Sequence, residues 1–249
     1  VCLSKSTELN WFNEWSKLCE EELNQIKPSE FQRCFSNWVR SVADLTNGEV
    51  IAIDGKTARR SHNRPLGKSA IELVSAWAQG NRLTLGQVKV MDGSNEITAV
   101  PELLRLLQIK GCIVTVDAIN TQKETVEEIR QQEADYVVAL KGNHGKLHEA
   151  VAELCDAVEG DRTVNLPFDV HVTVEKDHGR IETRRYLSIA AVYWLPGKEQ
   201  WRDLHSVGMV IATREVDGVA TKAVRYYLSS LAVCALTLAK AVRGHWSVE

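Results

Sequence analysis

The sequence lacks the long apolar segments that membrane and secreted proteins need. No run of about 18 apolar residues is present, so no membrane-spanning helix is expected. The amino end shows no basic residues followed by a short apolar core, so no signal peptide is expected either. The hydrophobic share of 44% is ordinary for a globular protein, and the length of 249 residues is ample for a hydrophobic core.

Cysteine is present, but not in the spacing of a metal site or a disulfide framework. The six cysteines are scattered, without a CxxC pair, and several lie in apolar runs. This pattern argues against a structural zinc site and against a secreted fold held by disulfides. We therefore expect reduced thiols in the core of a cytoplasmic protein.

An excess of basic residues is also lacking. Lys and Arg number 30 against 33 Asp and Glu, whereas proteins that depend on phosphate contacts are usually basic. Basic residues nevertheless crowd residues 56–68 and 176–185, and each segment alone is most simply a solvated charged loop. A glycine-rich phosphate loop after a strand is missing too, which weakens the case for a doubly wound small-molecule enzyme.

What the sequence does contain is a pair of apolar strands that each end in an aspartate. Residues 50–57 read VIAIDGKT and residues 112–118 read CIVTVDA. Neither apolar run alternates with polar residues, which is typical of central strands covered on both faces. Asp54 and Asp117 fall near the ends of these strands. A lone aspartate there often only caps a turn, but two such strands can bring two carboxylates to one sheet edge, which favours a divalent metal ion.

The periodicity of the rest predicts an α/β protein with a mixed sheet. Residues 1–41 have a helical pattern. After them strands and helices alternate, which requires crossover connections and helices on the faces of the sheet. The expected strands are 50–53, 71–78, 83–90, 112–118 and 136–140, and the expected helices are 95–107, 121–132 and 147–158.

A β-rich segment follows at residues 161–231, and a helix then runs from residue 232 to the end. Alternating β-branched residues predict four strands in this segment. They are 171–176, 183–192, 207–214 and 222–228.

This order of elements is that of the ribonuclease-H-like fold, and six strings match one family. They are GEVIAIDGKT (48–57), GCIVTVDA with TQKE (111–124), ADYVVALKGNHG (134–145), HGRIETRRY (178–186), RYYLSSL (225–231) and AVRGHWSVE (241–249). The chain resembles the DDE transposases of bacterial insertion sequences, in the ISAs-type group that includes the H-repeat-associated proteins. The resemblance implies a ribonuclease-H-like mixed sheet flanked by helices, with a β-rich insertion before the last helix.

The periodicity and the resemblance together predict a division of the chain. Residues 1–47 form an N-terminal helical segment, residues 48–160 the catalytic core, residues 161–231 the β-rich insertion and residues 232–249 the last helix of the core. Because the family continues this helix beyond the point where the sequence stops, we expect the helix to be truncated.

Three acids are assigned by the same resemblance. Asp54 and Asp117 match the two metal-binding aspartates of the family, and Glu249 matches its glutamate. Glu182 is a rival third acid, although its neighbouring arginines also predict a salt-bridged strand residue. The family implies two Mg²⁺ or Mn²⁺ ions, held by these acids for cleavage of DNA strands at element ends and their transfer to a target.

Contacts to the DNA backbone are expected from polar residues near these acids, because such contacts give affinity but little sequence information. They are Lys56, Arg59, Arg60, Lys141, Asn143, Lys176, His178, Arg180, Arg185, Arg243 and His245. For Lys141, Asn143 and His144 a plain turn role stays equally open. The expected partner is double-stranded DNA, bound by a homodimer in the bacterial cytoplasm, at the nucleoid when active.

Two other functions stay open at this point. One is a catalytically inactive or truncated transposase remnant that at most binds DNA. The other is a related nuclease that cuts without joining. The sequence shows no helix-turn-helix that would read the element ends.

Overall fold

The computed structural model describes residues 27–43, 45–58, 61, 70–91, 93–160, 165–177 and 179–246. The chain divides into two compact units, residues 1–43 and residues 44–249. In the first unit, helix α2 (Pro28–Val42) starts at a proline, which suits the first turn because its missing N–H has no helical partner there. Among the described helices, none is long and apolar enough to cross a bilayer.

The second unit is built on a nine-stranded mixed sheet, as the sequence predicted for the fold class. Its strand order is β3-β2-β1-β4-β5-β9-β8-β7-β6. Strand β1 pairs in parallel with β4, and β4 with β5, while the other neighbours are antiparallel. The strands are β1 (Val50–Thr57), β2 (Glu72–Ala78), β3 (Leu83–Lys89), β4 (Ile113–Val116), β5 (Asp135–Leu140), β6 (Phe168–Asp177), β7 (Arg180–Ala190), β8 (Ser206–Val216) and β9 (Val219–Ser229).

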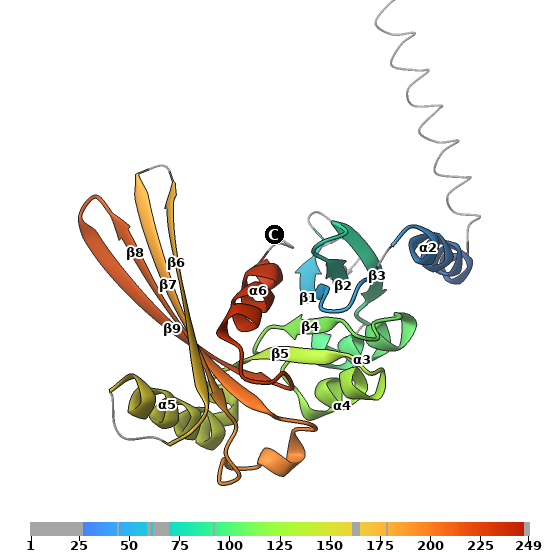
Figure 1. Cartoon of the computed structure of the whole chain (residues 1–249). Helices are drawn as coiled ribbons and strands as arrows, with labels where there is room; N and C mark the ends of the chain where they lie inside the picture. Colours follow the sequence, from blue (N-terminus) through green and yellow to red (C-terminus); the bar gives the residue numbers. More distant parts are fainter. Residues whose placement is uncertain are drawn as a thin grey trace, which may run out of the picture. The chain divides into compact units, whose positions relative to one another are not determined.

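The strands of the predicted insertion continue this sheet. Strand β9 pairs with β5 from Val137 opposite Ser229 to Leu140 opposite Tyr226. Strands β6 to β9 are also longer than the sequence predicted, and the outer halves of β8 and β9 consist mostly of exposed residues, which give no burial pattern. Figure 1 shows these outer halves extending beyond the helices as two hairpins, β6–β7 and β8–β9, which we call the blade.

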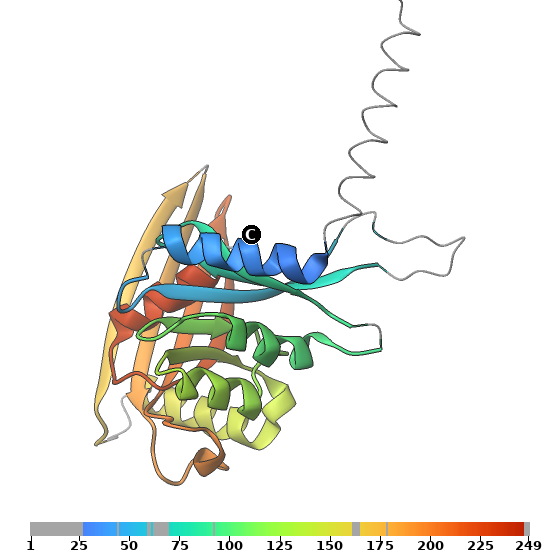
Figure 2. The same ribbon diagram turned by 90° about the vertical axis from the view of Figure 1, so that its right-hand side faces the viewer.

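Helices cover both faces of the sheet. They are α3 (Glu96–Leu106), α4 (Lys123–Gln131), α5 (Gly145–Glu159) and α6 (Ala235–His245). Figure 1 shows α6 on one face, and α3, α4 and α5 on the opposite face, and Figure 2 shows the same layers from the side. Coverage on both faces explains why all four residues of β4 are buried, as its unbroken apolar run predicted.

Small residues allow α6 to lie close to the sheet. Ala235, Ala239 and Ala241 are buried in a cluster that α6 shares with β4, β5, β7, β8 and β9. Gly244 lies over β1, where an added Cβ would come 2.8 Å from Val50 Cγ1 and would also collide with the side-chain oxygen of Gln79. Because Val50 belongs to a buried strand, it has little freedom to move away.

We predict that Gly244→Ala destabilises the protein. In an exposed helix this substitution would stabilise by about 1 kcal/mol, but the contact with Val50 should reverse the sign and cost about 1–3 kcal/mol. Urea unfolding measures the difference. Gly145→Ala is the matched control, because an added Cβ at Gly145 has nothing within 4 Å. A Gly244→Ala protein as stable as the control would contradict close packing of α6.

Candidate active site

The two predicted aspartates follow paired positions of neighbouring parallel strands. Ile53 of β1 is the register partner of Val116 of β4, and these are the last paired residues of the two strands. Asp54 and Asp117 come directly after this pair. Strand β1 then continues to Thr57 through its antiparallel pairing with β2, so Asp54 lies inside β1 but at the end of the parallel ladder.

Both aspartates lie on the side of the sheet that α6 covers. Val50, four residues before Asp54, contacts α6 at Gly244. Thr115, two residues before Asp117, lies 3.1 Å through its hydroxyl from Nδ1 of His245 in α6. Because residues four apart share a face of a strand, Asp54 projects on this face. Asp117 follows the end of β4 and lines a cavity on the same side together with Thr115 and His245.

Each carboxylate is partly exposed and has polar neighbours. The ammonium group of Lys56 lies 3.6 Å from Oδ2 of Asp54. Oδ1 of Asp117 accepts hydrogen bonds from the backbone N–H of Asn120, at 3.0 Å, and from its side-chain Nδ2, at 2.9 Å. Within the described part of the chain, neither aspartate is ion-paired to an arginine, and the charged neighbour of Asp54 is Lys56.

The two aspartates have the ligand chemistry that a hard divalent ion prefers, but the described residues alone do not complete a metal site. Carboxylate oxygens are the ligands that Mg²⁺ and Mn²⁺ prefer. Among the described residues, no three His, Cys, Asp or Glu side chains are close enough together to hold a metal ion. Glu249, the predicted third acid, lies outside the described residues. The metal-ligand roles of Asp54, Asp117 and Glu249 therefore stay predictions.

Beside the aspartates, the face that α6 covers carries a pocket lined by arginines. Across β7, β8 and β9, Arg184 is in register with Ala212 and Ala223, while Tyr186 is in register with Val210 and Arg225. The two alanines leave a hollow between larger neighbours. The result is a cavity of about 470 Å³, the arginine pocket, lined by Arg184, Arg214, Arg225, Arg243, Glu182 and Trp246 among others.

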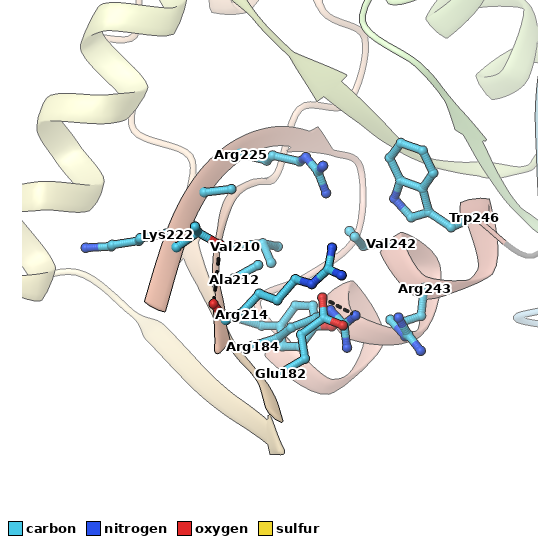
Figure 3. Close-up of a pocket in the computed structure, with 13 residues that line it drawn as sticks. Glu182, Arg184, Val210, Ala212, Arg214, Lys222, Arg225, Val242, Arg243 and Trp246 are labelled. Atoms are coloured by element: carbon cyan, nitrogen blue, oxygen red, sulfur yellow. Dashed lines mark hydrogen bonds and ion pairs between the residues drawn. The ribbon is translucent and has the colours of Figure 1, made fainter. Parts of the chain in front are cut away.

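The arginine pocket adjoins the aspartate site. Figure 3 shows the side chains of Arg214 and Arg225 reaching into the pocket and Trp246 on its far wall. Arg225 lies over the Trp246 ring, 5.1 Å from its centroid, a cation–π geometry. Both residues also line a smaller cavity of about 120 Å³ that contains Asp117, Lys141 and His245. The arginine pocket and the cavity at Asp117 thus share lining residues.

Comparison of the sequence with known proteins shows the family of this chain. A family model described as "Transposase DDE domain" matches residues 46–249. The chain belongs to the DDE transposase family. It is 38% identical over 233 residues to "H repeat-associated putative transposase YhhI" of Escherichia coli K12, which covers 90% of this chain and 60% of that protein. It is equally similar to "Putative protein YbfL" of the same strain, over the same shares.

A third relative is similar to this chain to the same degree. "Putative transposase YncI" of Escherichia coli O157:H7 is 38% identical over 234 residues, which is 91% of this chain and 58% of that protein. The chain therefore spans about three fifths of the length of the curated relatives it matches.

Within this DDE transposase domain, Glu182 is held by arginines. Its Oε1 lies 2.5 Å from Arg184 Nη2, and its Oε2 lies 4.0 Å from Arg180 Nε. Arg184 also donates to Glu175 at 2.8 Å, and Arg243 of α6 reaches the same carboxylate at 3.2 Å. The hydrogen bond from Arg184, with the charges of both arginines, lowers the pKa of Glu175. These contacts fit the salt-bridged role that was the alternative for Glu182.

Other predicted DNA contacts lie in different surroundings. Arg185 points to the opposite face, where its Nε donates to Glu159 of α5 at 2.9 Å. Asn143 donates to the carbonyl of Ala118 at 2.9 Å, and His144 lies 2.8 Å from the carbonyl of Thr121, so both hold the turn after β4. Lys141 lines the cavity beside Asp117. Lys176 is exposed on β6, and Arg59, Arg60 and His178 lie outside the described residues.

Several residues around the candidate site were not predicted from the sequence. Arg214, Arg225 and Trp246 line the arginine pocket, Asn120 donates to Asp117, and Glu96 accepts from Asn120. For the arginines, strand alternation was the available signal, because Arg184 and Arg185 must face opposite ways. Recognising Arg214 and Arg225 needed the strand register, which the sequence does not give.

We predict a measurable energetic coupling between Thr115 and His245, the contact that joins α6 to the aspartate strand. A double-mutant cycle with Thr115→Val and His245→Ala should give a coupling of about 1 kcal/mol in urea unfolding, the usual size for a hydrogen bond. Thr125→Val is the matched control, since the buried hydroxyl of Thr125 has no hydrogen-bond partner in the described structure and its loss should not destabilise. A coupling of zero would mean that this contact does not hold α6.

Proposed function

We propose that this domain cuts DNA strands at the ends of an insertion sequence and transfers them to a target, using Mg²⁺ or Mn²⁺. The observation that supports the proposal is the register of β1 and β4, in which Asp54 and Asp117 directly follow the last paired residues, Ile53 and Val116. The transposases among its relatives support the same reaction class. In this proposal Asp54, Asp117 and Glu249 hold two ions.

The bound ions would lower the pKa of an attacking hydroxyl and offset the charge of the leaving oxygen. The chain supplies position and electrostatics. Asp54 lies in β1 and Asp117 directly follows β4, and these two strands are hydrogen-bonded to each other up to the residue before each aspartate, so the backbone restricts where both carboxylates start. The Thr115 contact to His245 ties the helix that precedes Glu249 to the strand of Asp117.

In the proposal the arginine pocket binds the DNA backbone next to the scissile bond. Guanidinium groups match phosphate geometry and stay charged at all physiological pH values. Lys141 and His245 line the cavity between the pocket and Asp117, on the path that a strand would follow. The bound partner is double-stranded DNA, and we propose that a homodimer holds the element ends. In this proposal the β-rich segment at residues 161–231 binds the DNA.

A mutation pair tests the catalytic assignment. Asp54→Asn and Asp117→Asn should each reduce Mg²⁺-dependent nicking of a plasmid carrying the encoding element to the rate seen without metal, because an amide is a poor ligand for Mg²⁺. Circular dichroism should show an unchanged fold. Glu182→Gln is the matched control and should retain most of the cleavage.

Two results would count against this assignment. Persistent nicking by either asparagine variant would remove the two aspartates from the active site, and loss of nicking in Glu182→Gln would move the third acid to Glu182. If a chain extended past Glu249 nicks DNA and this chain does not, this chain is the inactive, DNA-binding remnant.

The arginine pocket predicts the salt dependence of DNA binding. Replacing both Arg214 and Arg225 by Ala should weaken binding and reduce the slope of log affinity against log salt by roughly 0.9 for each phosphate that is no longer neutralised. Fluorescence anisotropy with a labelled duplex at several salt concentrations measures this slope. Arg185→Ala is the control, because its guanidinium is engaged by Glu159 on the opposite face. Equal slopes for the double variant and the control would place the DNA elsewhere.

A further inference from the structure

Asn120 is a buried amide that binds the aspartate following β4. The residue is 1% exposed. It lies three residues after Asp117, and both its backbone N–H and its Nδ2 donate to Oδ1 of Asp117, at 3.0 and 2.9 Å. Within the described residues no hydrogen bond reaches Oδ2 of Asp117. One oxygen of the carboxylate is thus fixed by two donors, and the other is left for a cation.

The second hydrogen of the same amide faces another acid. Nδ2 of Asn120 lies 3.4 Å from Oε2 of Glu96. Glu96 is in the first turn of α3, where the helix dipole stabilises a negative charge. Its carboxylate occupies the space beside Gly55 that a side chain would fill, since a Cβ added to Gly55 would collide with all three carboxyl atoms of Glu96. Gly55 directly follows Asp54, so Glu96 lies next to the backbone of the first predicted ligand.

The carbonyl end of Asn120 shows that this arrangement is not a by-product of packing. Its Oδ1 is buried and has no hydrogen-bond partner among the described residues. Leaving a buried carbonyl unsatisfied costs free energy. Rotating the amide would turn the oxygen toward two carboxylates, which would repel it more. The side chain is therefore oriented by its NH₂ group, which bridges two negative groups.

We propose that Asn120 and Glu96 are positioning residues for Asp117, a role that rests on the proposed metal-dependent function. Asn120 fixes the rotation of the Asp117 carboxylate, so that Oδ2 faces the α6 side. Glu96 holds the amide in the orientation that does this, through its second hydrogen. Gly55 is required as the residue that leaves room for Glu96. Removing a residue that hydrogen-bonds to a metal ligand commonly lowers the metal affinity 10- to 100-fold.

Binding of Mn²⁺ to the protein, measured by the electron paramagnetic resonance signal of free Mn²⁺, tests this role without an activity assay. Asn120→Ala should weaken binding roughly 10-fold. Glu96→Ala should weaken it to a smaller extent, because the amide keeps its bond to Asp117. Glu96→Gln should bind like the original protein, because its side-chain oxygen still accepts from Asn120. A role in folding alone would lower the melting temperature without this order of affinities.

The controls separate this inference from the proposed function. Asp117→Asn should lower Mn²⁺ affinity most, and if it does not, the metal site itself is wrong. Gln122→Ala removes another amide of the same turn, one that donates to the carbonyl of Ile119, and should leave Mn²⁺ binding unchanged. If Asp117→Asn weakens binding but Asn120→Ala does not, the positioning role is refuted. If Glu96→Gln weakens binding as much as Asp117→Asn, Glu96 is a direct ligand and the positioning role is likewise refuted.

Should Asn120→Ala unfold the protein, Gly55→Ala provides a second test. The added methyl group would displace the Glu96 carboxylate while Asn120, Asp117 and their mutual bonds stay in place. Mn²⁺ affinity should then fall to the level of Glu96→Ala. An affinity equal to that of the original protein would refute the part assigned to Glu96.

Discussion

The architecture of the second unit depends on the packing of α6 against one face of the nine-stranded sheet. Buried alanines and Gly244 let the helix approach strands from both halves of the sheet. This packing decides which side chains share a compartment. Asp54, Asp117, Lys141 and the residues of the arginine pocket all project on the covered side, where the helix end carries Arg243 and His245. Apolar burial along α6 thus brings charged groups from distant parts of the chain together.

The fold class and the order of the strands along the chain were accessible from the sequence because they follow from local patterns. Unbroken apolar runs marked β1 and β4 as central strands, and the aspartates after them stood out for the same reason. The resemblance to a known family added the third acid. What stayed out of reach depends on pairing across long sequence separations. The continuation of the sheet through β9 onto β5 is one such feature, since a strand alone does not identify its neighbour.

The arginines illustrate the same limit at the level of single residues. Arg184 and Arg185 are adjacent in the sequence, and only the second was named as a candidate for DNA contact. In the structure Arg184 lines the pocket beside α6, and Arg185 binds Glu159 of α5. Which of the two faces which helix is fixed by the tertiary structure alone. Asn143 was equally ambiguous, and its bond to Ala118 places it in the support of the turn after β4.

The pairing of β9 with β5 has a mechanical consequence. The arginine pocket and the aspartates lie on one continuous ladder of backbone hydrogen bonds, from β7 through β8, β9 and β5 to β4. A swinging motion of the blade relative to Asp117 would require this ladder to break. The arginine pocket and the two aspartates are thus parts of one hydrogen-bonded sheet, so a DNA strand that contacted both, as proposed, would have to follow the shape of this sheet by its own deformation.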